Sequence, residues 1–495
     1  MNTTLIVPPT IDWSVLMPVI VVALGGIIAL LIEMFRPLKD NTMVVVASLA
    51  ALICAGASII MQLPLPSVET FAQMAMRDRP SLLLQLLIVS STFLIILFSE
   101  PYLRSKRIPF AEFYALALWS ASGAMIMVST KSLLMLFVGL EILSIALYVM
   151  AGMSKSETRS EESAIKYFLL GAFASAFLLF GIAYVYGATG SLHMDAITRG
   201  SMETQPLVRI PLTFGVALIL IGLLFKGAFA PFHQWTPDVY QGAPTNVTAF
   251  MAAVSKVAAI GALWRLLDSA VGLKEFYLPI LIGVAVLTMV LGNVAAIIQT
   301  DVKRVLGFSS IANAGYILVG IIAHLKEPEK VGISTTIFYL AGYTVMTIGA
   351  FAVISLTAKK GREGTEYKDL AGLWQRSKLA TTALVVFVVG LIGIPPFAGF
   401  FGKLYIWRDA VSVGLLPLSA VMALSSVVGI YYYVGIIRAA LVDSATATST
   451  LAKPRKSTQL AFILCLIGIF MMVGTQSVMD FIQGNADQVI QVTQK

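Results

Sequence analysis

The chain has 495 residues, of which 58% are hydrophobic and only 12% are charged, about half of the charged share of a typical soluble domain. Apolar runs long enough to cross a bilayer recur along almost the whole length, which excludes a soluble enzyme and predicts a polytopic helical membrane protein. The net charge of +8 is modest for this length, and it fits basic loops beside a membrane better than a nucleic-acid partner.

Fourteen apolar segments follow one another along the chain. Because backbone polar groups in lipid must be satisfied within each segment, we predict an all-α fold. The predicted spans, in chain order, are 12–35, 42–62, 81–99, 109–128, 131–151, 164–187, 211–231, 245–267, 276–298, 303–323, 331–357, 379–406, 413–438 and 458–482. The first run lacks a basic n-region and a small-residue cleavage site, so it is predicted to be a retained span.

The orientation of the spans follows from the lysines and arginines in the loops. Loops after odd-numbered spans carry sixteen, against eight in the loops after even-numbered spans and the C-terminal tail. Basic loops stay in the cytoplasm. We therefore predict a multi-pass membrane protein with both termini outside the cytoplasm, on the periplasmic or equivalent side.

Few residues suit cofactor chemistry. The two cysteines, Cys54 and Cys465, lie far apart inside apolar runs and form no metal-binding or disulfide pattern. The three histidines are isolated, and no glycine-rich nucleotide-binding motif is present. We predict that this chain itself binds no metal, nucleotide, iron–sulfur cluster or other redox cofactor.

Four charged side chains lie deep inside predicted spans: Glu141, Lys226, Lys256 and Lys403. A charge at the bilayer centre costs about 2.5–3.5 kcal/mol on insertion scales, so each should face protein or water. We interpret these side chains as groups that pair or exchange protons, although a structural ion pair of Glu141 with one lysine stays open. We read Lys256 as the only charge of its span, which favours a neutral lysine that takes and passes a proton.

Proline interrupts two of the spans. Pro231 follows Lys226 within GLLFKGAFAPFHQW, and Pro395 and Pro396 precede Lys403 within GIPPFAGFFGK. A proline removes an amide donor and frees the carbonyl four residues earlier, and membranes tolerate such breaks where the backbone lines a polar cavity. We predict discontinuous helices in spans 7 and 12, each with a lysine beside its break.

These two spans are five apart, and an odd offset gives them opposite orientations in the membrane. That arrangement is typical of an inverted repeat with ion sites at the broken helices, here spans 4–8 against spans 9–13. The predicted division of the chain is 1–108 for the N-terminal spans, 109–270 and 271–442 for the two repeats, and 443–495 for the last span and tail.

Four stretches together resemble a known family: FVGLEILSIALYVM, HQWTPDVYQGAPTNVTAFMAAVSK, DVKRVLGFSSIANAGY and GIPPFAGFFGK. The chain resembles subunit N of NADH:quinone oxidoreductase, respiratory complex I, over essentially its whole length. The separate motifs occur throughout the antiporter-like superfamily, whereas their combination with TPDVYQGAP is more specific to subunit N.

The resemblance implies a proton channel in the membrane arm of that complex. It implies that Glu141 pairs with Lys226 and that Lys256 and Lys403 continue a polar axis at the middle of the membrane. It also implies that NADH, FMN, iron–sulfur clusters and a quinone act in other subunits. The expected partners are the antiporter-like subunits L and M, the small subunits K, J and A, and through them the peripheral arm.

Two other classes of function remain open at this point. The chain could belong to a multi-subunit cation/proton antiporter, or to the membrane part of an energy-converting hydrogenase. The proteins that copurify with it would distinguish these from complex I.

Overall fold

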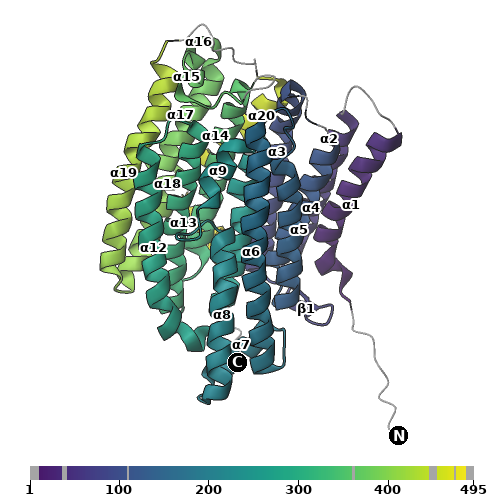
Figure 1. Ribbon diagram of the computed structural model, residues 1–495, viewed down its shortest axis with the longest axis vertical. Coiled ribbons are helices and arrows are strands. Elements are labelled where there is room, and N and C mark those ends of the chain that lie inside the picture. The colour runs from purple at the N-terminus through teal and green to yellow at the C-terminus, as the bar shows by residue number, and fades with distance from the viewer. Residues whose placement is uncertain are drawn as a thin grey trace.

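The computed structural model describes residues 11–35, 42–106, 108, 111–358, 363–444, 454–472 and 475–486. Its helices run side by side, most of them along the long axis of the molecule (Figure 1). The hairpin strand β1 and the short helix α7 lie at one end, and α15 and α16 lie at the other, which we call the basic end because the loops after odd-numbered spans are there.

The helices of the first half are α1 Trp13–Phe35, α2 Thr42–Gln62, α3 Arg79–Lys106, α4 Ala111–Val128, α5 Leu133–Ala151, α6 Thr158–Thr189, α7 Met194–Met202, α8 Pro206–Lys226, α9 Trp235–Gly242, α10 Thr245–Phe250, the π-helix η1 Met251–Ser255 and α11 Lys256–Ser269. The second half contains η2 Val271–Leu273, α12 Lys274–Ile297, α13 Val302–Lys326, α14 Ser334–Ile354, η3 Ser355–Thr357, α15 Tyr367–Leu370, α16 Leu373–Arg376, α17 Lys378–Ile392, α18 Ala398–Ser412, α19 Leu416–Leu441, α20 Lys456–Met471 and α21 Thr475–Ala486.

The all-α prediction is confirmed, with one small addition and a different count. Within the described residues, twelve helical segments are long and apolar enough to cross a membrane, and α17 and α20 are shorter apolar helices. The number of fourteen spans is therefore not confirmed. A two-stranded antiparallel hairpin, β1 Val68–Thr70 with β2 Ala75–Arg77, was not predicted, and it pairs Val68 with Arg77.

Some predicted boundaries were wrong. The seventh span was predicted to run to residue 231, but α8 ends at Lys226 because the chain turns before the proline. The last span, predicted as 458–482, contains two helices, α20 and α21. The predicted break in span 12 is present between α17 and α18.

The basic loops are only partly described. Residues 36–41, 107, 359–362 and 445–453, which carry several of the counted lysines and arginines, lie outside the described residues, as do 1–10 and 487–495. Two of the basic residues assigned to this end are not loop charges exposed to water. Lys106 is 3% exposed and Lys303 is fully buried, because both take part in an ion cluster described below.

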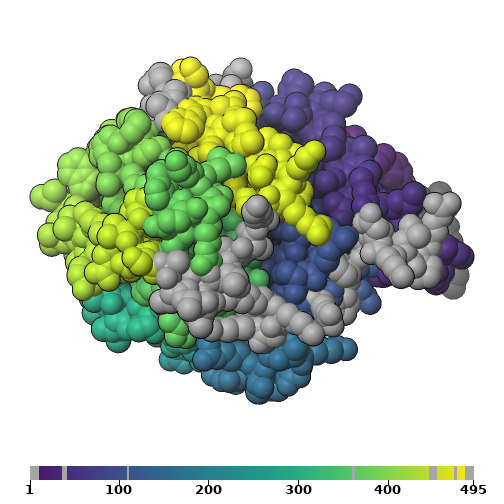
Figure 2. All heavy atoms as spheres, turned by 90° about the horizontal axis from the view of Figure 1, so that it is seen from above, coloured from purple at the N-terminus to yellow at the C-terminus, as the bar shows by residue number. Residues whose placement is uncertain are grey.

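The centre of the bundle is formed by the helices that carry the polar residues. The most apolar stretch is completely buried in the segments Thr245–Ser269 and Val302–Lys326. In Ser334–Thr357 almost all of that stretch is buried. By contrast, α1, α2 and α19 bury only a third of theirs. Seen from the basic end, the C-terminal segment lies between the N-terminal helices and the second half (Figure 2). The outer helices therefore shield the central ones from lipid.

Candidate functional site

The first helix break places Lys226 at the end of α8. Gly227 caps the helix through its N–H, and Ala228 follows in the sparsely populated left-handed region at φ 63°. The Lys226 side chain is 4% exposed, and its amine donates to Ser144 Oγ at 2.7 Å and to the Tyr167 hydroxyl at 3.1 Å. A cavity of about 10 Å³ beside it has room for roughly one water molecule.

Glu141 lies on α5, one turn before Ser144. In the described part of the chain no ion pair joins it to Lys226, and its Oε1 atom is buried without a hydrogen-bond partner. The carboxylate is nevertheless close enough to act electrostatically on the lysine. Ser144, on the same helical face as Glu141, is thus a direct partner of Lys226.

Lys256 begins α11 directly after the π-helix η1, and single π turns inside α-helices are frequent at functional sites. It is 2% exposed, its amine donates to the Ser310 carbonyl at 2.5 Å, and it lies 5.6 Å from the centre of the Tyr343 ring. Its description as the only charge of its span was wrong. Arg265 lies in the same helix and binds Asp78 through both guanidinium nitrogens, at 2.9 and 3.0 Å.

The second break places Lys403 on α18, after the proline pair. Its amine spans the break and donates to the carbonyls of Leu391 at 3.2 Å and Ile392 at 2.9 Å. It also donates to Ser426 Oγ at 2.9 Å. These carbonyls belong to the last turn of α17. The residues four positions later are Pro395 and Pro396, which have no backbone N–H to donate to them. A pocket of about 440 Å³, apolar apart from Lys403 and Ser426, opens beside the amine.

Buried polar side chains fill the space between Lys256 and Lys403. Ser310 Oγ accepts from the Tyr343 hydroxyl at 2.8 Å, and Tyr316, whose ring centre lies 5.0 Å from the Lys403 amine, accepts from Asn293 at 2.9 Å. The other members of this network are Ser309, Asn313, Tyr339, Tyr432 and Tyr433. These contacts form a nearly continuous polar connection along one face of α13.

The sequence analysis missed this network, although a signal was present. Within FSSIANAGY, Ser309, Asn313 and Tyr316 recur every three or four residues, the spacing that puts polar groups on one face of a helix. That face is visible in the sequence, but its partners on α12, α14 and α19 are not, because they come from distant parts of the chain.

Aromatic side chains lie beside Lys226, towards the chain segment of Lys256. The Tyr167 ring stacks on Trp235 with ring centres 4.6 Å apart, and Trp235 donates to the Phe225 carbonyl at 3.0 Å. The buried Ser255 hydroxyl, next to Lys256 in the chain, has no hydrogen-bond partner among the described residues and lies near Tyr167. Tyr167, a hydrogen-bond partner of Lys226, thus lies near the residue that precedes Lys256.

Comparison with known proteins gives a consistent assignment. The family described as NADH:quinone oxidoreductase/Mrp antiporter matches residues 130–429. The chain is 38% identical to NADH-quinone oxidoreductase subunit N of Trichlorobacter lovleyi, over 86% of this chain and 87% of that protein. It is 42% identical to subunit N of Mycobacterium tuberculosis, over 77% and 71%.

The chain belongs to the NADH-quinone oxidoreductase subunit N family.

Solved structures agree with membership in the subunit N family. A chain of respiratory complex I from Thermus thermophilus with bound aureothin superposes with a TM-score of 0.77 at 32% identity, covering 92% of this chain and 97% of that one. A chain of the Mrp complex from Dietzia has a TM-score of 0.84 at 19% identity, covering 96% and 97%. The second likeness shows a shared fold alone. As a subunit N, the chain is an antiporter-like, proton-translocating membrane subunit of complex I.

Proposed function

We propose that Glu141, Lys226, Lys256 and Lys403 form the proton path of this subunit N. The observation that supports this proposal most is that Lys226 and Lys256 are buried and Lys403 is partly buried, and that all three, in the described structure, have hydroxyls or carbonyls as hydrogen-bond partners. A buried ammonium without a carboxylate partner is costly, and desolvation favours its neutral amine. Each lysine can therefore hold a proton briefly and pass it on.

The loading step is assigned to the first break. Moving the Glu141 carboxylate towards Lys226 would favour the ammonium, and moving it away would release the proton. Ser144 and Tyr167 hold the amine in place while its charge changes. Lys256 then relays the proton, and Lys403 passes it on beside the second break. Each pK unit corresponds to about 1.36 kcal/mol, so a modest movement of one charge is sufficient.

The surroundings of the chain form part of the same proposal. It lies in the bacterial inner membrane with both termini in the periplasm, next to subunits L and M and the small subunits K, J and A. NADH, FMN, iron–sulfur clusters and the quinone react in other subunits. The spans divide at residues 108, 270 and 442 into N-terminal helices, two inverted repeats and a C-terminal part. Reporter fusions to the segment 363–376 test the orientation, and a periplasmic signal would contradict it.

The central test uses Lys256, because it is the middle group of the path. In inside-out membrane vesicles at matched complex content, Lys256→Ala should abolish most proton uptake and quinone reduction together. Lys256→Arg should impair both as well, since a guanidinium hardly releases its proton. Oxidation of NADH by an artificial acceptor should persist. Lys274→Ala, the same change on the exposed first residue of α12, is the control, and normal pumping by Lys256→Ala would remove this residue from the path.

A further inference from the structure

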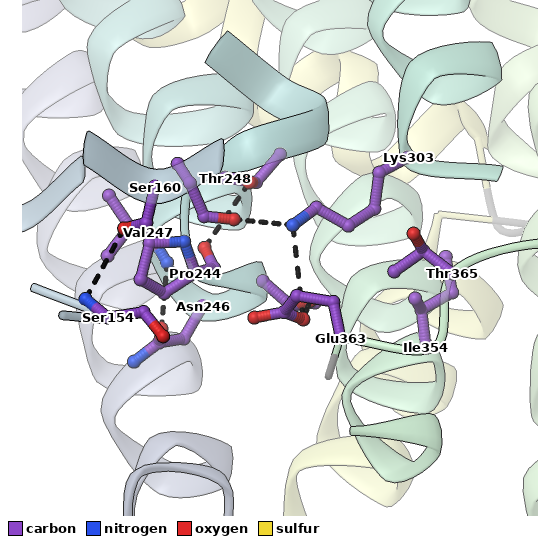
Figure 3. A network of polar contacts seen from close by, with 12 residues as sticks. Ser154, Ser160, Pro244, Asn246, Val247, Thr248, Lys303, Ile354, Glu363 and Thr365 are labelled. Carbon is purple, nitrogen blue, oxygen red and sulfur yellow. Dashed lines mark hydrogen bonds and ion pairs between the residues drawn. The ribbon is translucent and has the colours of Figure 1, made fainter. Parts of the chain in front are cut away.

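A second group of buried charges lies at the basic end, where α3, α10, α13 and the segment 363–366 meet (Figure 3). Lys303, the second residue of α13, is fully buried, and its amine donates to the Ala243 carbonyl and lies 4.0 Å from Glu363 Oε2. Glu363 accepts from the Thr245 hydroxyl at 2.7 Å and also from the Tyr102 hydroxyl. None of these residues belongs to the path proposed above.

The charged groups around this pair come from every element packed against it. Lys106 of α3 lies 3.6 Å from Glu363 and also pairs with Glu157, which precedes α6. Asp301 precedes α13 and acts on Lys303 as well. Three carboxylates therefore face two ammonium groups. Among the described residues, this arrangement favours the ammonium form of both lysines.

Glu363 has a defined charge in this setting. Burial alone would raise the pKa of its carboxyl, but Lys303 and Lys106, with the hydrogen bonds from Tyr102 and Thr245, hold that pKa below its usual value. The carboxyl is therefore ionised at neutral pH. Within the pair, the Lys303 amine is then the group that can take up and release a proton during a cycle. The carboxylate 4.0 Å away stabilises its charged form.

A pocket lies on the outer side of the cluster. This pocket of about 220 Å³ is lined by Tyr102 together with Arg104, Ser105, Arg455 and Thr458, and it is large enough for several water molecules. The hydroxyl of Tyr102, which is one of the residues lining this pocket, donates to Glu363. A single buried hydroxyl thus separates the water-accessible pocket from the carboxylate of the pair.

The inner side of the cluster leads towards the path. The Thr248 hydroxyl donates to the Tyr240 carbonyl at 3.0 Å, and the buried Tyr240 hydroxyl lies against Ser310. Ser310, whose carbonyl binds Lys256, follows Lys303 by two turns of α13, about 10 Å along the helix axis. The Ser310 end of this interval, next to Lys256, is therefore polar.

We propose that Lys303 and Glu363 form the proton-uptake site of the path. Protons from the basic end reach the Lys303 amine past the Tyr102 hydroxyl, with Glu363 staying ionised as the carboxylate that attracts them, and they leave by way of Tyr240 and Ser310 to Lys256. In each cycle the amine gains one proton from water in the pocket and loses it towards Lys256, and no electron moves. The proposal rests on the proton path of the preceding subsection.

The test measures proton uptake and quinone reduction in inside-out vesicles over a series of bath pH values, at matched complex content. Glu363→Gln should lower both rates by about tenfold, the change in proton occupancy for one pK unit, and shift the pH profile downwards, because Lys303 without its carboxylate holds a proton less tightly. Thr245→Val removes a hydrogen bond that stabilises the carboxylate but keeps every charge, so its profile should shift upwards. A merely structural role predicts no such pair of opposite shifts.

The control breaks another buried ion pair of similar depth. Asp78 and Arg265 are 7% and 6% exposed, and they lie outside the uptake site. Asp78→Asn should reduce the amount of assembled complex but leave the pH profile unchanged. Wild-type rates and pH profiles in both Glu363→Gln and Thr245→Val would overturn the uptake site. If Glu363→Gln does not assemble, the rates and pH profile of Thr245→Val alone decide whether the uptake site stands. Normal pumping by Lys256→Ala would instead overturn the path itself.

Discussion

Both helix breaks place a lysine beside an interrupted helix, but the two lysines have different binding partners. At the first, Lys226 precedes the break and binds two side-chain hydroxyls, with the Glu141 carboxylate nearby. At the second, Lys403 follows the break and binds two main-chain carbonyls across it. The first lysine lies beside a cavity for about one water, and the second opens onto a pocket of about 440 Å³.

The two lysines therefore differ in how freely their binding partners can move. The partners of Lys226 are side chains that can rotate, and its nearest negative charge is a carboxylate on another helix. Two of the three partners of Lys403 are main-chain carbonyls, and they are fixed because the α17 and α18 halves meet so closely that a Cβ on Gly399 would stand 1.9 Å from the Gly390 oxygen. Only glycine fits there. We infer that charge coupling occurs at the first break and that the second mainly holds its lysine in position.

The largest effect is expected for Lys226→Met, which removes the titrating group but keeps the apolar stem. Coupled proton uptake and quinone reduction should fall by roughly a hundredfold or more, the usual contribution of a group that transfers protons. Both rates are measured in inside-out vesicles, with the amount of assembled complex determined in parallel. A variant that assembles and pumps normally would contradict the assignment of Lys226.

The next effect is expected for Glu141→Gln, which keeps the shape of the side chain and removes its charge. Pumping should fall by about tenfold, because a change of one pK unit at Lys226 corresponds to a tenfold change in proton occupancy. Assembly should be nearly normal, since the structure shows no direct ion pair between these two described residues. If assembly falls and the rate per complex does not, Glu141 is structural.

For Lys403→Met we expect a smaller loss of rate and a larger loss of stability. The amine joins the two halves of the broken helix, and hydrogen bonds to a charged group contribute about 1.5–3 kcal/mol. The rate per complex should fall by about fivefold, less than for Lys226→Met, because charge coupling is assigned to the first break. Thermal unfolding of the purified complex checks the first part. Unchanged thermal stability would contradict the inference that Lys403 holds the two halves of the broken helix together.

The smallest effects compare the two serines that bind these lysines. Ser144→Ala leaves Lys226 with Tyr167 as its remaining partner, whereas Ser426→Ala leaves Lys403 with two carbonyls. A neutral hydrogen bond contributes about 1 kcal/mol, so Ser144→Ala should slow pumping by roughly three- to fivefold and Ser426→Ala by less. Equal effects in the paired assay would show that the two breaks hold their lysines in the same way.

The sequence alone determined the class of protein, the positions of most helices, both breaks and the four deep charges. Each of these depends on local pattern: apolar length, proline, and a charge where lipid would otherwise be. The positions of Lys226 and Lys403 beside the breaks needed no tertiary contact to predict, because proline acts on the backbone within four residues of itself.

Tertiary structure decided which groups those charges meet. Nothing local indicates that Lys256 binds Ser310, that Arg265 pairs with Asp78, or that Lys303 and Glu363 are buried together. These partners are separated by tens to hundreds of residues, and a lysine at a helix start has the same local pattern whether it is exposed or covered. Burial and pairing depend on how α3, α10, α13 and α14 pack, and that packing is a property of the whole bundle.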